Sequence, residues 1–390
     1  MTKVSRMVTA TILSMSLLTV MAAAAIAPAM GIIKQHFNGA PDMTVQLIIS
    51  LPALFIILTN LCFLPISRVL RTRTIAIIGL LIYVLAGSGC FFIDNLPLIL
   101  VMRALLGVSV GLIMPLSTGL LAYYFPPEEQ AKMMGLSAAM NQMGGVVGTL
   151  MAGILGSIDW NYAFLVYLFG LIALLMILRW LPNEQLGSSN KRGKAFEPRQ
   201  LLKFHPSVFG MLLLTIVFFV FPTNFAMISS RKLGFDTGTI TVLMVALDLL
   251  AFFVGLVFGR LMHTFRNSIK YFPPLALILG YALYAAADGF TLVLIGSAFI
   301  GLGNGIGVPY LLTIGSIKGG KNSATTVMPL LSASLYLGQF ISPLIILSSS
   351  EFLFGTDDLV GPYKVAVLIS VIYLVQVWST RHFQSLPPAE

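Results

Sequence analysis

Long runs of apolar residues, separated by short polar segments, occupy most of the chain. A helix needs roughly 20 apolar residues to cross a hydrocarbon layer of about 30 Å, and only a helix satisfies its own backbone groups there. Runs of this length therefore predict transmembrane α-helices. Twelve are present, at Val8–Ile33, Thr44–Leu64, Ile75–Phe92, Leu98–Tyr123, Ala131–Leu155, Tyr162–Leu181, Ser207–Ile228, Gly238–Met262, Tyr271–Ala287, Leu292–Ile314, Thr325–Leu347 and Tyr363–Trp378.

The first run has some features of a cleavable signal peptide. Lys3 and Arg6 precede an apolar stretch that contains small residues at Ala22–Ala25. The stretch is longer than the apolar region of a signal peptide. It also contains Pro28, which has a counterpart in the second half. We therefore interpret it as a transmembrane helix.

The two halves of the chain are similar. A shift of 194 positions superimposes prolines, acids and glycines without drift, pairing Pro28 with Pro222, Asp42 with Asp236, Asp94 with Asp288, Gly107 with Gly301, Gly111 with Gly305, Pro115 with Pro309, and Gly144 with Gly338. Six spans in each half predict parallel repeats. We expect a six-helix bundle in residues 1–181, a polar cytoplasmic linker in 182–206, and a second bundle in 207–390.

Composition agrees with a membrane protein. Hydrophobic residues make up 57% of the chain and charged residues 9%, whereas soluble domains are about one quarter charged. With the N-terminus inside, 18 of the 23 Lys and Arg residues fall on the cytoplasmic side, four fall outside, and Arg103 lies in a span. This bias predicts a multi-pass protein of the cell membrane (inner or plasma) with both termini in the cytoplasm. The net charge of +9 is thereby explained without nucleic acid.

Two charged residues inside predicted spans, Arg103 and Asp248, are the strongest candidate functional residues. Arg103 costs about 2.5 kcal/mol or more at mid-helix, and Gly107 and Gly111 follow it at four-residue intervals. Asp248 is the carboxylate deep in a span, and burial would favour its proton uptake near neutral pH. Their repeat mates are Ser297 and Leu54, so the fold requires neither charge. Snorkelling of Arg103 to headgroups and an interhelical hydrogen bond of Asp248 are the alternatives.

The motifs resemble those of the major facilitator superfamily, and within it the twelve-helix drug:proton antiporters. Arg103-Ala104-Leu105-Leu106-Gly107 is similar to the fourth-helix Arg-x-x-x-Gly element, and Gly144, Gly148, Thr149 and Gly153 are similar to the fifth-helix antiporter motif without its proline. The loop after the second helix keeps Arg68 and Arg71, but Ser67 replaces the family's aspartate. Its second copy keeps Gly259, with His263 at the acidic position.

The resemblance implies the major facilitator fold, an all-α membrane protein of two pseudo-symmetric six-helix bundles, and assigns roles to these residues. Arg103 and Asp248 would serve proton coupling or hold the charge of the substrate. Gating and helix packing would use Gly107, Gly111, Gly144, Gly148, Gly153, Arg68, Arg71 and Gly259, with the fifth helix bending at the interface between the halves. A substrate cavity would be lined by Asn141, Gln142, Asn224, Asn304, Tyr310, Tyr336, Gln339, Met114 and Met227. Interhelical hydrogen bonds are the alternative role of these polar residues.

We expect a secondary transporter and not an enzyme. No Gly-x-x-x-x-Gly-Lys-Ser/Thr run is present, so a gradient and not nucleotide hydrolysis would drive it. Cys62 and Cys90 show neither disulfide nor metal spacing, and no cofactor or metal is expected. The leading hypothesis is a monomeric, proton-coupled exporter of small amphipathic compounds in the lipid bilayer. An uptake carrier or facilitator for a metabolite or organic anion is the alternative, and a sensor or channel is the more remote one.

Overall fold

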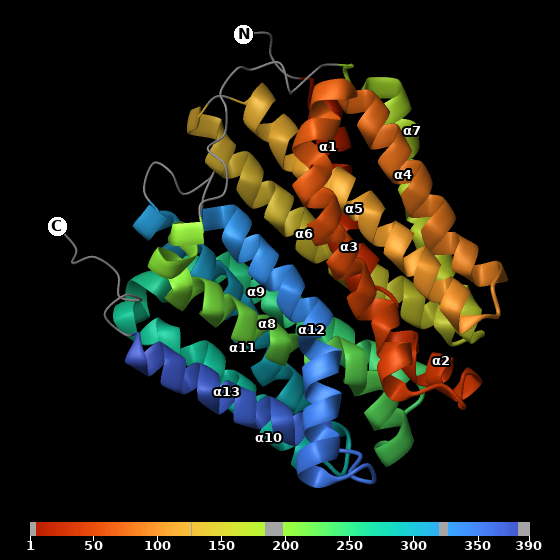
Figure 1. Cartoon of the computed structure of the whole chain (residues 1–390), viewed down its shortest axis with the longest axis vertical. Coiled ribbons are helices and arrows are strands. Elements are labelled where there is room, and N and C mark those ends of the chain that lie inside the picture. The colour runs from red at the N-terminus through yellow and green to blue at the C-terminus, as the bar shows by residue number, and fades with distance from the viewer. Residues whose placement is uncertain (1–4, 126, 184–197, 320–326, 381–390) are drawn as a thin grey trace. The chain divides into compact units, whose positions relative to one another are not determined.

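The structure is a computed structural model that describes residues 5–125, 127–183, 198–319 and 327–380 (Figure 1). These residues are mainly helical, and no strand occurs among them. Eleven helical segments are long and apolar enough to cross a membrane, and one of them, Thr237–Ala286, has 50 residues. At 1.5 Å per residue that segment is more than twice as long as one crossing requires, and it contains two helices, α9 and α10. The expected all-α membrane fold with twelve spans is confirmed.

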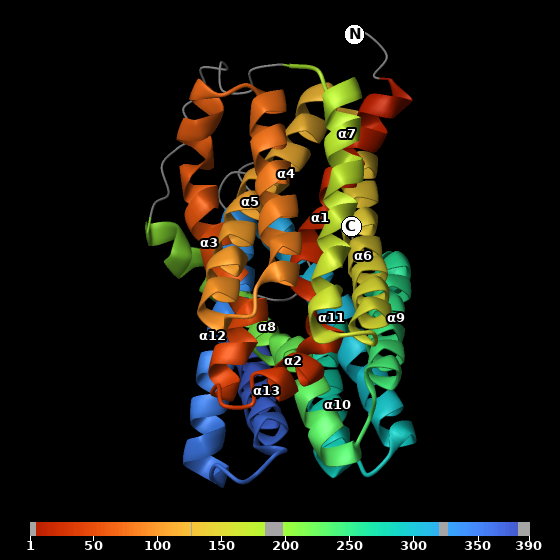
Figure 2. The ribbon, with the colours of Figure 1, turned by 90° about the vertical axis from the view of Figure 1, so that its right-hand side faces the viewer.

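The chain divides into two compact units. The first consists of Met1–Lys191 and Asp236–Thr241. Its helices α3, α4, α5 and α7 run along a common direction (Figure 2). The elements of this unit are α1 (Arg6–Ala24), η1 (Ala27–Ala29), α2 (Met30–His36), α3 (Asp42–Val69), α4 (Thr72–Gly89), η2 (Cys90–Phe92), α5 (Leu96–Tyr124), α6 (Pro127–Gly156), η3 (Trp160–Phe169) and α7 (Gly170–Trp180).

The second unit consists of Arg192–Phe235 and Val242–Glu390. Its elements are α8 (Pro198–Leu233), α9 (Thr237–Phe265, whose first residues group with the first unit), η5 (Arg266–Tyr271), α10 (Phe272–Ala286), α11 (Phe290–Gly319), α12 (Met328–Phe354) and α13 (Gly361–Ser379). Residues 184–197 of the expected linker lie outside the described part of the chain. Residues 198–206, also expected in the linker, form the beginning of α8.

The first span of each unit responds differently to its proline. A proline has no N–H to donate, so it removes one helical hydrogen bond. In the first unit α1 ends at Ala24, a short 3₁₀ segment contains Pro28, and α2 starts at Met30. In the second unit α8 continues through Pro222 without interruption. The sequence predicted one continuous helix over Val8–Ile33, and the structure breaks this span at the 3₁₀ segment that contains Pro28.

Helix packing repeats between the units. A Cβ atom at Gly107 in α5 would lie 2.9 Å from Cβ of Phe55 in α3. One at Gly301 in α11 would lie 2.9 Å from the carbonyl oxygen of Leu247 in α9. Both positions therefore need glycine so that the two helices can approach closely. The pairs α3–α5 and α9–α11 occupy equivalent places in the repeat, as do α1–α6 and α8–α12, which approach at Gly144 and Gly338.

Large apolar side chains cover the outside of the helices. Leu61, Leu85 and Leu175 of the first unit are 74%, 68% and 66% exposed, and Phe253 and Val375 of the second are 58% and 57% exposed. Contiguous apolar surface is rare on proteins that face water. Hydrocarbon is the solvent in which such a surface is stable, in agreement with a multi-pass membrane protein.

Asp236, the repeat mate of Asp42, caps the start of α9. Its carboxylate accepts hydrogen bonds from the Thr239 hydroxyl at 2.5 Å and from the backbone N–H groups of Gly238 and Thr239, both at 3.2 Å. The hydroxyl, followed by the N–H groups, lowers the pKa of this carboxyl. The cap is therefore complete above the ordinary carboxyl range, and it is lost only as the pH falls through that lowered pKa.

We expect Asp236→Ala to accelerate amide hydrogen exchange over residues 238–241 about fivefold, since an N-cap contributes about 1 kcal/mol. Asparagine can still accept these hydrogen bonds, so Asp236→Asn should recover most of the protection. Equal exchange in the wild type and Asp236→Ala would show that the cap does not stabilise this turn.

Candidate functional site

Arg103 is enclosed by aromatic side chains inside the first unit. It lies on α5 and is 1% exposed. Its Nη1 donates a hydrogen bond of 2.8 Å to the Tyr167 hydroxyl, and Nη2 lies 3.9 Å from Sγ of Cys90. The guanidinium carbon is 4.9 Å and 4.8 Å from the ring centroids of Phe164 and Tyr167. The side chain is therefore held within the bundle and does not extend to its surface.

The charge of Arg103 is stabilised without a carboxylate. In the part of the chain that the structure describes, no acidic residue forms an ion pair with it, and its Nε has no hydrogen-bond partner. An arginine stays protonated in proteins. One hydroxyl, one sulfur atom and two ring faces thus support a permanent positive charge, the rings through cation–π attraction.

Tyr167 connects the arginine to the first span. Its hydroxyl accepts from Arg103 and donates at 3.1 Å to the carbonyl oxygen of Ala22. Ala22 lies in the last turn of α1, where carbonyl groups have no helical donor. A second tyrosine, Tyr83, donates at 3.2 Å to the carbonyl of Leu18, one turn earlier. The site is therefore a layer of arginine and tyrosines beside the end of α1.

The glycines near Arg103 are already in contact with other helices. Gly107 and Gly111, which follow Arg103 at four-residue intervals, pack against α3. A Cβ atom at Gly111 would lie 2.6 Å from Cβ of Thr59. Gly144 and Gly148 of α6 face α1 of the same unit, where a Cβ at Gly148 would lie 2.8 Å from Cγ of Met21. Their role in gating stays a prediction.

A buried cluster of hydroxyl groups joins α1, α5 and α6. The Ser16 hydroxyl lies 2.7 Å from those of Ser117 and Ser137. The Thr19 hydroxyl donates at 2.8 Å to the side-chain oxygen of Asn141. Of these five residues, only Asn141 was predicted from sequence, and its side-chain oxygen bonds between helices, as the alternative interpretation had it. Single serines in apolar runs give no local signal, so the cluster is visible only in three dimensions.

The other predicted residues of the first unit are spread along it. Met114 on α5 and Gln142 on α6 are half-buried, and Gly153 is buried. Arg68, in the last turn of α3, and Arg71, which precedes α4, are exposed. The structure thus brings neither arginine to Arg103.

The predicted residues of the second unit are distributed over four helices. Buried members are Asn224 and Met227 on α8, Tyr310 on α11 and Gln339 on α12, and half-buried members are Asp248 on α9, Asn304 on α11 and Tyr336 on α12. Asn224 bonds within its own helix, donating at 3.2 Å to the Val220 carbonyl and at 2.9 Å to the Thr223 hydroxyl. Gly259 on α9 is exposed. Arg103 and Asp248 belong to different units.

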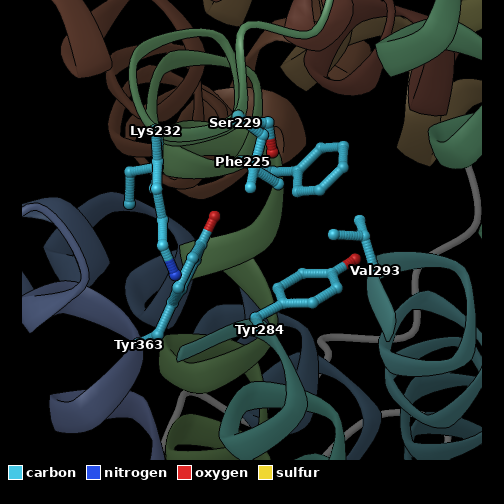
Figure 3. Close-up of a pocket in the computed structure, with 8 residues that line it drawn as sticks. Phe225, Ser229, Lys232, Tyr284, Val293 and Tyr363 are labelled. Carbon is cyan, nitrogen blue, oxygen red and sulfur yellow. The ribbon is translucent and has the colours of Figure 1, made fainter. Parts of the chain in front are cut away.

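One small cavity of the second unit contains residues that the sequence did not single out. It has a volume of about 10 Å³ and is lined by Phe225, Ile228, Ser229, Lys232, Leu233, Tyr284, Val293 and Tyr363 (Figure 3). The Lys232 amine donates to the Ala285 carbonyl at 3.1 Å. This volume is at the lower limit for one water molecule, so the cavity does not hold an organic substrate in this conformation.

No group of histidine, cysteine, aspartate and glutamate side chains that could hold a metal ion occurs among the described residues. Three contacts between basic and acidic side chains of the described residues lie near the ends of the spans. Lys34 lies 3.0 Å from Asp42, His36 lies 2.6 Å from Asp94, and Lys364 lies 2.6 Å from Asp358. The Lys364 amine lowers the pKa of the Asp358 carboxyl.

Comparison with known proteins places the chain among transporters. A family model described as the Major Facilitator Superfamily matches residues 12–343. The quinolone resistance protein NorA of Staphylococcus aureus (strain MRSA252) is 25% identical over 301 residues, which cover 71% of this chain and 73% of NorA. The multidrug transporter protein MdtP of Bacillus subtilis (strain 168) is 28% identical over 135 residues, which cover 33% of this chain and about a quarter (25%) of MdtP.

A solved structure shows a similar fold at low identity. The nucleoside transporter NupG, crystallised as a mutant, gives a TM-score of 0.78 with 12% identity and covers 95% of this chain and 99% of NupG. At this identity the likeness concerns the fold and not the substrate.

Proposed function

The chain belongs to the Major Facilitator Superfamily, and on this premise we propose that it exports small amphipathic organic compounds in exchange for protons. It is a multi-pass membrane transporter and not an enzyme. Transport would proceed by alternating access, in which the two repeats rock around a site near the middle of the bilayer. The observation that carries the proposal is the similarity to a quinolone resistance protein over 71% of the chain.

Arg103 and Asp248 are the residues to which we assign coupling. The enclosed guanidinium of Arg103 is a fixed charge that cannot move to solvent, so nearby proton binding must take place in its field. Asp248 is a carboxylate in an apolar span, half-buried on α9. Intramembrane acids of this kind commonly carry protons or bind cations in transporters. Asp248 would therefore accept the proton or the positive charge of the substrate.

The cell membrane is the proposed location, with both termini in the cytoplasm. The excess of Lys and Arg in the loops that would then face inward supports this orientation. The inward proton gradient across such a membrane would supply the energy for export. We propose a monomer as the transporting species, since each repeat already supplies half of the alternating-access machinery.

Flux measurements in proteoliposomes test the direction of coupling. A permanently charged quaternary ammonium compound should accumulate in vesicles with an acidic lumen, because protons leave as the compound enters. Accumulation only in vesicles with an alkaline lumen would show proton symport, the coupling expected of an uptake carrier. Equal flux under both gradients would show a facilitator. Neutral and anionic compounds in the same assay would identify the substrate class.

Replacing Arg103 by lysine should reduce gradient-driven flux at least about tenfold. Lysine lacks the planar guanidinium group, which donates to Tyr167 and at the same time lies over two aromatic rings. Arg179 on α7 is exposed, and Arg179→Lys is the matched control with an expected wild-type rate. Full activity of Arg103→Lys would show that only the positive charge at this position is needed.

A further inference from the structure

In each unit a buried tyrosine hydroxyl donates to the backbone of the first span near its proline. In the first unit Tyr167 of η3 donates to the Ala22 carbonyl at 3.1 Å. In the second unit Tyr281 of α10 donates to the Val217 carbonyl at 2.7 Å and lies 3.4 Å from the carbonyl of Phe218. Both tyrosines are fully buried. The two hydrogen bonds end on equivalent turns, since a shift of 194 places Ala22 next to Val217.

These carbonyl groups belong to residues that lie about one turn before the paired prolines. Pro222 cannot donate to Phe218, four residues earlier, so that carbonyl loses its helical partner. Ala22 lies in the last turn of α1, just before the 3₁₀ segment that contains Pro28. An unpaired backbone group inside a membrane protein is strongly destabilising. In the second unit the Tyr281 hydroxyl lies 3.4 Å from this Phe218 carbonyl, while its shorter bond ends on the preceding Val217 carbonyl. In the first unit Tyr167 supplies a donor to a carbonyl in the last turn of α1.

The tyrosine occupies a different position of the repeat in each unit. The shift of 194 aligns Tyr167 with Gly361 and Tyr281 with Gly87, so tyrosine and glycine have exchanged places. In the first unit Tyr167 requires glycine at position 87, because a Cβ atom there would lie 2.5 Å from Cβ of Tyr167. In the second unit a Cβ atom at Gly361 would meet the Ser350 side chain. In the first unit tyrosine at both positions would therefore not fit, and glycine at both would remove the hydroxyl.

The units differ in what binds the neighbouring groups. In the first unit Arg103 donates to the Tyr167 hydroxyl and approaches Cys90. At the equivalent positions of the second unit Ser297 and Tyr284 form a neutral hydrogen bond of 2.6 Å, and neither contacts the hydroxyl of Tyr281 in the described structure. A hydrogen bond from a charged donor polarises the tyrosine O–H and strengthens its bond to Ala22.

We propose that Tyr167 and Tyr281 are positioning residues whose hydroxyl-to-carbonyl hydrogen bonds stabilise the proline turns of the two first spans. We call this stabilisation the hold, and propose that Arg103 strengthens it in the first unit alone. The break between α1 and α2 is then a hinge whose opening depends on the Arg103–Tyr167 contact. Use of the hinge during transport rests on the proposed function. The hydrogen-bond arrangement itself does not, so the two can fail separately.

Hydrogen exchange of the full chain in lipid nanodiscs tests the hold directly. Tyr167→Phe keeps the ring that Arg103 covers and removes only the hydroxyl. Amides of residues 25–31 should exchange about fivefold to tenfold faster, the change that loss of one hydrogen bond produces in local opening. Tyr83→Phe is the matched control, because the Leu18 carbonyl that it contacts lies inside α1 and keeps its helical donor. Exchange there should change less than about twofold.

Two further variants separate the contributions. Tyr281→Phe should accelerate exchange over residues 217–224 and leave residues 25–31 unchanged. Arg103→Leu should accelerate exchange over residues 25–31, by less than Tyr167→Phe does, and leave residues 217–224 unchanged. Unaltered exchange in Tyr167→Phe would overturn the hold at the first hinge, and unaltered exchange in Tyr281→Phe would overturn it at the second. Wild-type exchange in Arg103→Leu would overturn the contribution of the arginine.

The exchange of tyrosine and glycine supplies a rescue. The double variant Gly87→Tyr/Tyr167→Gly copies the arrangement of the second unit, and it should restore slow exchange over residues 25–31 relative to Tyr167→Gly alone. No restoration would show that the two hydroxyls are not equivalent. The slope of flux against pH should also differ between Tyr167→Phe and Tyr83→Phe if the hinge is used in transport. Equal slopes together with altered exchange would retain the hold and refute its use in proton-coupled transport.

Discussion

Replacing Asp248 by asparagine is expected to reduce proton-driven accumulation of substrate to the passive leak of the vesicles. The two side chains have nearly the same shape, but asparagine can neither bind nor release a proton. A coupled transporter that lacks its titrating group can still change conformation. Exchange of substrate between the two sides in the absence of a gradient should therefore remain within about threefold of the wild type, the scatter of a conservative intramembrane change of up to about 0.6 kcal/mol.

Asp288→Asn is the matched control for this prediction. Asp288 is exposed at the end of α10, outside the spans, and undergoes the same chemical change. It should transport as the wild type does. If Asp248→Asn retains gradient-driven accumulation with an unaltered pH profile, then Asp248 is not the coupling group. Loss of transport for cationic compounds alone, with neutral ones still driven by the gradient, would assign Asp248 to substrate charge.

Any side chain at Gly144 is expected to destabilise the first unit. A Cβ atom there would overlap the carbonyl oxygen of Leu17 and lie 2.8 Å from its carbonyl carbon. Backbone cannot rotate aside as a side chain can, so α1 would have to move away from α6. Overpacking of this kind costs typically about 1–3 kcal/mol. We expect Gly144→Ala to lower the free energy of unfolding by about that amount, and Gly144→Leu to yield little folded protein.

Gly255→Ala provides the comparison. Gly255 lies in the interior of α9 with no atom within 4 Å of a built Cβ. Alanine there should be neutral or stabilising by up to about 1 kcal/mol, because glycine loses more backbone freedom on folding. Unfolding by a denaturing detergent measures both. A stability of Gly144→Ala equal to that of the wild type would show that α1 and α6 do not approach as closely as the structure indicates.

The glycine-rich fifth span, α6, illustrates a limit of sequence motifs. The resemblance to antiporters led us to expect a bending seam between the halves at Gly144, Gly148 and Gly153. Gly144 and Gly148 face α1 within their own unit, whereas a Cβ atom at Gly153 would meet the side chain of Thr241 in the first turns of α9. Use of these glycines in gating stays a prediction. A leucine at Gly148 would press on Met21 and Ala25, just before the break in the first span. We therefore expect Gly148→Leu to weaken this unit, and not only to trap one transport conformation.

Much of the fold could be predicted because the bilayer acts on each span separately. A run of about 20 apolar residues must be helical in hydrocarbon wherever the rest of the chain lies, so the spans could be read locally. For the same reason the sequence predicted two spans in the 50-residue helical segment Thr237–Ala286, which contains α9 and α10. The repeat was visible because Gly107 and Gly301, or Gly144 and Gly338, retain the same packing role after a shift of 194.

The candidate site was predictable only in part. Arg103 was evident because a charge in an apolar run is costly and rare. Its surroundings were not, since Tyr167 is 64 residues away and Ala22 is 145 residues from Tyr167. The aligned pairs Tyr167–Gly361 and Gly87–Tyr281 were a signal that could have identified the tyrosine. In the first unit these two positions share one space, because a Cβ atom at Gly87 would lie 2.5 Å from Cβ of Tyr167.

The sequence alone determined the membrane as solvent, the helical spans, the twofold repeat and the membership in a transporter family. The first three follow from composition and periodicity, which act over one or two helices at a time, and the family membership follows from the resemblance of motifs and the family model that matches residues 12–343. The tertiary structure decided that the first span breaks at Pro28 while α8 continues through Pro222, that Arg103 is enclosed and has no acidic partner among the described residues, and that a tyrosine hydroxyl meets the carbonyl groups before each proline. These features depend on which side chains occupy one space. That choice is made by close packing between helices distant in sequence.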